Sequence, residues 1–222
     1  MSNYRLYHSP GACSLAAHIA FEELGIPYEP VRVVIAEGQN QTPDYLAVNP
    51  RGRVPALAIC DQDAAGVTPK EQILTELSAI LIYLAKTYPD AHLLPEDALS
   101  FARAVEWMSW LGATMHAAGV RTVLRPERFV SDPGAAAAVK TRGTENILVG
   151  YADIEVRLTG RTWALGDQYS VVDMYLLVFF RWGNRVGLPM RQKYPNYTRM
   201  MDAVRARPAV QRAIAHEGIE IE

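Results

Sequence analysis

The feature of this sequence that most constrains its fold is the loss of strand-like segments after residue 97. Four short runs rich in β-branched and aromatic residues precede that point, at residues 4–8, 28–35, 54–60 and 71–74. Beyond a proline-flanked stretch at residues 88–96, apolar residues recur only at helical spacing. We therefore predict an α/β domain at residues 1–87, a linker at 88–96 and an all-helical domain at 97–222.

The start of the chain predicts a strand–helix–strand unit. A strand-like run at residues 4–8 is broken by Ser9-Pro10-Gly11, and a helical pattern then runs to Gly25 before the second strand. Such a unit normally pairs its two strands in parallel through a right-handed crossover. Residues 61–69 are expected to form a polar hairpin connection between the last two strands.

Local signals also mark helix starts. Thr42-Pro43 and Asp132-Pro133 are each typical of a helix N-terminus, and Thr75 is expected to cap another helix. Residues 170–180 are nearly all apolar and predict a buried central helix of the second domain. Ser170 and Asp173 stand at capping-box spacing in front of it, which we interpret as structural.

Composition excludes several classes of function. The formal net charge is −2 and the basic residues are scattered, so neither nucleic acid nor a membrane surface is the expected partner. No apolar run approaches the roughly 18 residues of a membrane span. The polar N-terminus has no signal-peptide pattern, which predicts a cytoplasmic protein. The two cysteines, Cys13 and Cys60, are expected to be free thiols, and no Cys/His spacing indicates a metal site.

Cys13 is the first candidate for chemistry because it lies between a strand and a helix. Unpaired N–H groups and the helix dipole at that position favour a thiolate and raise its reactivity. The alternative is a small apolar side chain in a tight turn. Ser14 next to it could activate a bound thiol through its hydroxyl, or could only cap the helix.

Two further motifs could bind a peptide-like ligand. Val54-Pro55 begins a strand, where a proline requires either an edge position or a cis bond. Sequence alone favours trans, whereas a cis bond would let Val54 pair with an extended peptide. Glu76 and nearby N–H groups at a helix start could hold the ammonium and carboxylate of an amino acid. The alternative for Glu76 is a dipole-matched helix start.

Taken together, these motifs resemble the glutathione transferase superfamily and, within it, the bacterial beta-type (cysteine) enzymes. The resemblance covers essentially the whole chain. It is carried by residues 7–15, by residues 49–57, by Thr75-Glu76 with Ala79-Ile80, by residues 170–173, by Trp107 nine residues before His116, and by residues 207–210.

The resemblance implies a thioredoxin-like, glutathione-binding N-terminal domain and a helical-bundle, substrate-binding C-terminal domain. It implies a cis Val54-Pro55 bond, glutathione as co-substrate, and a homodimer. His116 would reach in from the helical domain to join Cys13 and Ser14 as catalytic residues. The implied glutathione contacts are Ala12, Cys13, Arg53, Val54, Pro55, Glu76 and Leu77.

The sequence departs from the family pattern at four places. Leu77 stands where relatives often have Ser or Gly, so one hydroxyl contact to glutathione is lost while the backbone N–H is kept. Ser109 and Ala117 replace residues that are often Asn and Lys near the histidine. His8 is often Tyr, and the hairpin at residues 61–69 is longer than usual.

The leading interpretation is conjugation of the glutathione thiolate to small, largely apolar electrophiles, with detoxification as the family role. A second is glutathione-dependent thiol–disulfide exchange through Cys13, for which glutathione must supply the second thiol. A third is a non-catalytic binding protein of the same fold. The sequence does not identify the electrophile; candidate lining or core residues are Met108, Met115, Arg121, Arg125 and Phe129.

Overall fold

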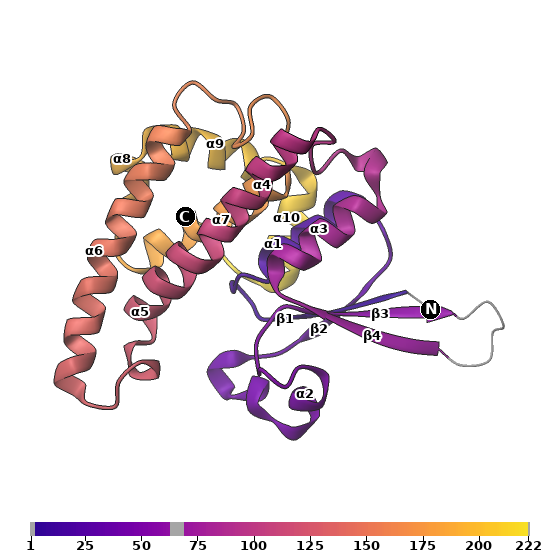
Figure 1. The fold of residues 1–222 in the computed structure, drawn as a ribbon, viewed down its shortest axis with the longest axis horizontal. Coiled ribbons are helices and arrows are strands. Elements are labelled where there is room, and N and C mark those ends of the chain that lie inside the picture. The colour runs from indigo at the N-terminus through magenta and orange to yellow at the C-terminus, as the bar shows by residue number, and fades with distance from the viewer. Residues whose placement is uncertain (1–2, 63–68, 222) are drawn as a thin grey trace. The chain divides into compact units, whose positions relative to one another are not determined.

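A computed structural model describes residues 3–62 and 69–221 (Figure 1). Its contacts divide the chain into two compact units. The first unit combines Met1–Leu94 with Arg205–Ile221, and the second is Pro95–Val204. The sequence-based boundary had assigned residues 205–221 to the helical domain, whereas in the structure this segment packs with the N-terminal part of the chain.

The first unit contains a four-stranded mixed sheet in the order β2-β1-β3-β4. The strands are β1 (Tyr4–His8), β2 (Glu29–Arg32), β3 (Ala56–Gln62) and β4 (Pro69–Thr75). Strands β1 and β2 are parallel, as the sequence predicted, and β3 is antiparallel to both β1 and β4. The predicted hairpin connection at 61–69 falls largely on residues 63–68, which lie outside the described residues.

Helices cover both faces of this sheet (Figure 1). Helices α1 (Leu15–Leu24) and α3 (Leu77–Thr87) lie on one face, and the short α2 (Pro43–Val48) lies on the other. Helix α10 (Pro208–Glu217) packs against α1. Short 3-10 turns complete the unit at Ile35–Glu37, Gln39–Gln41 and Pro89–Ala91. This arrangement confirms the thioredoxin-like N-terminal domain.

Apolar side chains on both faces hold the sheet and its helices together. Leu15 and Ile19 of α1 and Ile80 of α3 are fully buried on one side. Tyr7 and Val54 belong to a separate buried cluster on the α2 side. Full burial of each such side chain contributes about 1.5–3 kcal/mol.

The second unit is helical. It contains α4 (Ala98–Trp110), a π-helical segment (Leu111–Val120), α5 (Arg121–Leu124), a 3-10 turn (Pro126–Arg128), α6 (Pro133–Arg157), α7 (Val171–Arg185), α8 (Met190–Lys193) and α9 (Pro195–Arg205). Thr42 and Asp132 cap α2 and α6 as predicted. Among the described residues, no helix is both long and apolar enough to cross a membrane.

Helix α7 is the buried central helix that the sequence predicted, and Asp173 fixes its start. The side chain of Asp173 is fully buried. One carboxylate oxygen accepts the N–H of Ala164 at 2.8 Å, and the other accepts the N–H of Ser170 at 2.8 Å and its hydroxyl at 3.0 Å. Burial raises the pKa of Asp173 to about 6, and the hydrogen bonds oppose that shift. The confirmed capping box therefore also joins the preceding loop to α7.

Replacing Asp173 with Ala should lower the free energy of unfolding by about 3 kcal/mol, because it leaves buried donors at Ser170 and Ala164 without an acceptor. Asp97 offers a matched control, since it caps α4 in an exposed position by accepting the N–H of Ser100 at 2.9 Å. Asp97→Ala should cost about 1 kcal/mol. Urea unfolding of both variants measures the difference, and equal losses would contradict a special role for the buried carboxylate.

Candidate functional site

Cys13 lies in a loop between β1 and α1. The loop contains a turn from Ser9 to Ala12, which is closed by a hydrogen bond from the Ala12 N–H to the Ser9 carbonyl at 3.0 Å. Gly11 within this turn adopts a left-handed φ of 64°. The Cys13 side chain is 8% exposed, and its Sγ donates to the Val54 carbonyl at 3.5 Å. The fold therefore brings together two of the residues that the sequence singled out, which are 41 positions apart.

Ser14 shapes this loop from inside. Its hydroxyl is fully buried, accepts the Ser9 N–H at 3.1 Å and donates to the Ser9 carbonyl at 3.2 Å. Ser14 occupies the N-cap position of α1, but its side chain makes no capping hydrogen bond with the described residues of that helix. In this arrangement the one hydroxyl hydrogen of Ser14 is used within the protein.

The peptide bond between Val54 and Pro55 is cis, as the family resemblance implied. The backbone just before it is held from the α2 side. The Arg53 carbonyl accepts the Tyr45 hydroxyl at 2.7 Å and the Asn49 side-chain amide at 2.7 Å. The Arg53 side chain is exposed, whereas Val54 and Pro55 are buried. The backbone segment before β3, which lies beside Cys13, is therefore held by hydrogen bonds within the protein.

Ala12 contributes apolar contact rather than a polar group. It is partly buried and packs against the cluster that contains Val54 and Tyr45. Ala12 thus links the Cys13 loop to the segment before β3 that contains Val54.

Glu76 has the least ordinary backbone of the candidate residues. It stands at the N-cap position of α3 with φ 70° and ψ 119°, and its exposed side chain makes no capping hydrogen bond to the described part of the chain. A non-glycine residue in such a conformation costs about 1–3 kcal/mol and is typical of functional sites. Leu77 follows as the buried first residue of α3, where helix geometry leaves its backbone N–H without an intrahelical partner.

The predicted cap at Thr75 was wrong. Thr75 is the last residue of β4, where it lies opposite Ala56 of β3. Its hydroxyl accepts the Arg51 guanidinium at 3.1 Å. The strand ladder thus continues one residue further than the sequence pattern indicated, and Glu76 takes the N-cap position.

His116 belongs to the second unit, within the π-helical segment. Its ring centroid lies 4.8 Å from that of Trp182 and 6.5 Å from that of Phe179. The side chain is partly buried, and π-helical segments occur frequently at functional sites. Its participation with Cys13 stays a prediction.

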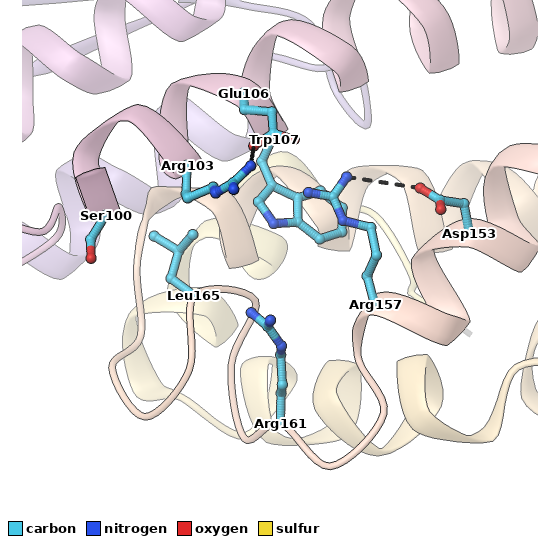
Figure 2. Close-up of a pocket in the computed structure, with 8 residues that line it drawn as sticks. All are labelled: Ser100, Arg103, Glu106, Trp107, Asp153, Arg157, Arg161 and Leu165. Carbon is cyan, nitrogen blue, oxygen red and sulfur yellow. Dashed lines mark hydrogen bonds and ion pairs between the residues drawn. The ribbon is translucent and has the colours of Figure 1, made fainter. Parts of the chain in front are cut away.

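The second unit also contains a pocket of about 520 Å³ (Figure 2). The Arg157 guanidinium lies 3.5 Å from the Trp107 ring centroid and 3.8 Å from a carboxylate oxygen of Asp153, and burial lowers the pKa of Arg157. The pocket is lined by Ser100, Arg103, Glu106, Trp107, Asp153, Arg157, Arg161 and Leu165. Three cations and two carboxylates make it unlike the apolar site expected for the electrophile. Of the candidates that could be lining or core residues, Met108 and Met115 are core residues.

A cluster of histidine and glutamate side chains near the Cys13 loop was missed by sequence reasoning. Within the described residues, ligand-type atoms of His8, His18 and Glu217 lie within 4.8 Å of one another, and so do those of His18, Glu22 and His216. Glu217 is 199 residues from His18 in sequence, so linear spacing gives no signal for the contact. The prediction of no metal used only the spacing of Cys and His residues along the sequence. The fold brings together side chains that lie far apart in the sequence, which such spacing does not reveal.

Family models match both units of the chain. The model described as glutathione S-transferase, N-terminal domain, matches residues 11–87, and the model for the glutathione S-transferase C-terminal domain matches residues 111–208. The first covers the Cys13 loop, Val54-Pro55 and Glu76. The second covers His116 and the capping box of α7.

Individual relatives agree with these matches. Glutathione S-transferase GstA of Escherichia coli O157:H7 is 30% identical over 97% of this chain and 100% of its own. A glutathione transferase homologue from Sulfitobacter, solved with bound glutathione, has a TM-score of 0.87 at 33% identity, covering 99% and 100% of the two chains. A beta-class glutathione S-transferase from Sphingomonas chungbukensis has a TM-score of 0.80 at 32% identity, covering 97% and 100%. The chain therefore belongs to the glutathione S-transferase family.

Proposed function

We propose that this chain conjugates the thiol of glutathione to small, largely apolar electrophiles, as a glutathione transferase of the cysteine type. The observation that carries the proposal is the position of Cys13, whose Sγ lies 3.5 Å from the carbonyl of Val54 beside a cis proline. A thiol beside the extended backbone that precedes β3 suits a peptide ligand that carries its own thiol. The Sulfitobacter relative with bound glutathione supports the choice of that peptide.

The proposed binding mode uses each end of the tripeptide. The cysteinyl backbone of glutathione pairs with Val54 as a short added strand, next to Pro55 and Arg53. The γ-glutamyl ammonium binds the exposed Glu76 carboxylate, and its carboxylate binds N–H groups at the start of α3, including that of Leu77. Ala12 and Cys13 then lie beside the glutathione sulfur. The unusual backbone of Glu76 is consistent with a residue held in place for a ligand.

The proposed chemistry depends on stabilising a thiolate. Glutathione loses its thiol proton to solvent, and N–H groups of the Cys13 loop at the start of α1 favour the resulting anion. The thiolate sulfur then forms a bond to the electrophilic carbon, and the leaving group departs with the electron pair of the broken bond. Ser14 acts by holding the loop shape, and we propose His116 as the contribution of the helical unit to the same reaction.

Thiol–disulfide exchange is the second candidate function, and the position of Cys13 just before the start of α1 favours it. In that reaction the Cys13 thiolate attacks the glutathione sulfur of a disulfide between glutathione and another thiol, forms a mixed disulfide with glutathione and releases the other thiolate. A glutathione thiolate then attacks the mixed disulfide, leaves as oxidised glutathione and restores the Cys13 thiolate. The other cysteine, Cys60, lies in β3, so exchange would use glutathione rather than a neighbouring protein thiol.

We further propose a cytoplasmic homodimer with a role in detoxification, as the family resemblance implies. Light scattering of the purified chain measures the assembly state. A monomer at micromolar concentration would contradict the dimer without affecting the glutathione site of the first unit.

Glutathione titrated into the wild-type protein should bind, and Glu76→Ala should weaken binding by about 10- to 100-fold, because one charged hydrogen bond is lost. Isothermal calorimetry measures both. Glu145→Ala is the matched control, since Glu145 is an exposed carboxylate on α6 paired with Arg142 at 2.7 Å. It should leave binding unchanged. Absence of binding to the wild type would overturn the site assignment.

Removing the Cys13 thiol should separate the two candidate reactions. Cys13→Ala should lower conjugation of glutathione to a chlorodinitrobenzene by about tenfold or more if the thiol helps to position the glutathione sulfur. Conjugation at the full rate would mean that Cys13 is not catalytic in that reaction.

Oxidised glutathione should add one glutathionyl group to the wild-type protein if exchange occurs through Cys13. Intact-mass analysis detects this adduct, which should persist in Cys60→Ala and disappear in Cys13→Ala. An unmodified wild-type protein would exclude the exchange reaction.

A further inference from the structure

The loop that carries Cys13 is tied to a carboxylate from the far end of the first unit. The backbone N–H of Gly11, in the middle of the loop, donates to Oε2 of Glu217 at 2.7 Å. Glu217 is the last residue of α10, which packs against α1 (Figure 1), and it is 2% exposed. A buried backbone N–H needs an acceptor, and here a side chain 206 positions away supplies it.

The same carboxylate contacts both segments that flank the loop. Oε1 of Glu217 lies 3.0 Å from Nδ1 of His18 in α1 and 3.3 Å from Nδ1 of His8 at the end of β1. His18 is fully buried and His8 is 4% exposed. The strand before the loop, the loop itself and the helix after it therefore converge on one carboxylate group.

The proton positions in this group are constrained. A carboxylate only accepts hydrogen bonds, so His18 must carry a proton on Nδ1 to bond with Glu217. His18 Nε2 lies 3.0 Å from Nδ1 of the exposed His216, so a single proton between those two nitrogens completes the chain of hydrogen bonds to the surface. Burial opposes ionisation of Glu217, but the hydrogen bonds from His18 and Gly11 and the nearby His8 ring outweigh it and hold the pKa of Glu217 below its ordinary value.

We propose that Glu217 is a positioning residue for the proposed glutathione reaction: oriented by His18, it holds the Gly11 N–H and thereby fixes the loop that places Cys13 beside Val54. The expected effect on kcat rests on the proposed function. The expected effect on the shape of the loop follows from the geometry alone. Glu217 touches neither Cys13 nor the expected ligand position in the described contacts, and it acts through the backbone between Ser9 and Ser14.

The alternative is that Glu217 only docks α10, and the chain offers a matched control for it. Glu23 of α1 accepts the guanidinium of Arg207 through both carboxylate oxygens, at 2.5 and 2.8 Å, and so joins the same two segments of the first unit. This ion pair does not include Gly11 or Glu217. Glu23→Leu therefore weakens docking, whereas Glu217→Leu weakens docking and also releases the loop.

The experiment compares Glu217→Leu, Glu217→Gln and Glu23→Leu in the full chain. Steady-state kinetics with glutathione and a chlorodinitrobenzene give kcat and the KM for glutathione, and hydrogen-exchange mass spectrometry follows the peptide that spans Ser9 to Ser14. Glu217→Leu should lower kcat by about tenfold or more, change the KM by less than about threefold and accelerate exchange in the loop. Glu217→Gln keeps an oxygen for Gly11 and should stay within about threefold of the wild-type kcat.

Glu23→Leu should lower the melting temperature while leaving kcat and loop exchange as in the wild type. Equal loop exchange or equal kcat loss in Glu23→Leu and Glu217→Leu would overturn the proposal, and so would unchanged loop exchange in Glu217→Leu. If the wild type neither binds nor turns over glutathione, the proposed function fails, and loop exchange in the three variants still decides the role of Glu217. Should Glu217→Leu not fold, a failure of Glu217→Gln to keep wild-type loop exchange would overturn the proposal.

Discussion

The rest of this structure depends on one constraint: the backbone N–H and carbonyl groups that are buried where strands and helices end must find hydrogen-bond partners. Each such group costs about 1–3 kcal/mol if it loses water and gains no partner. Side chains supply the partners here. Asp173 accepts N–H groups before α7, Ser14 bonds both backbone groups of Ser9, and Tyr45 donates to the carbonyl of Arg53. These side chains hold the irregular segments in place, and two of those segments, the Cys13 loop and the backbone before Val54, belong to the candidate site.

Much of the fold follows from local sequence because its signals are local. Thr42, Asp132 and Ser170 each stand directly before the helix that they cap, and the apolar periodicity of residues 170–180 needs no distant information. Thr75 marks the limit of this reasoning. A threonine before a helical pattern is a good cap, but the ladder between β3 and β4 continues to Thr75 and moves the helix start to Glu76. Tertiary pairing decided between two locally acceptable states.

The candidate site was predictable to a different degree. Cys13 and Glu76 attract notice from their places next to helix starts, and the family resemblance supplied the cis bond at Val54-Pro55. The contact between Cys13 and Val54 required the fold to be known. Glu217 gave no signal at all, since a glutamate near the end of an amphipathic helix reads as a solvated residue. Glu217 is buried because α10 packs against α1, and the whole second unit separates these two helices in the sequence.

The division of the chain into units has a consequence for biosynthesis. The first unit is discontinuous, with Pro95–Val204 inserted between its two parts. A nascent chain emerging from the ribosome can form the sheet and α1 early, but the backbone around Gly11 stays without its acceptor until residue 217 has been made. A loop made before the second unit is thus completed by a residue made after it. Residues 1–94 are for this reason not a module that can be excised or shuffled as a gene fragment without also carrying the segment at 205–221.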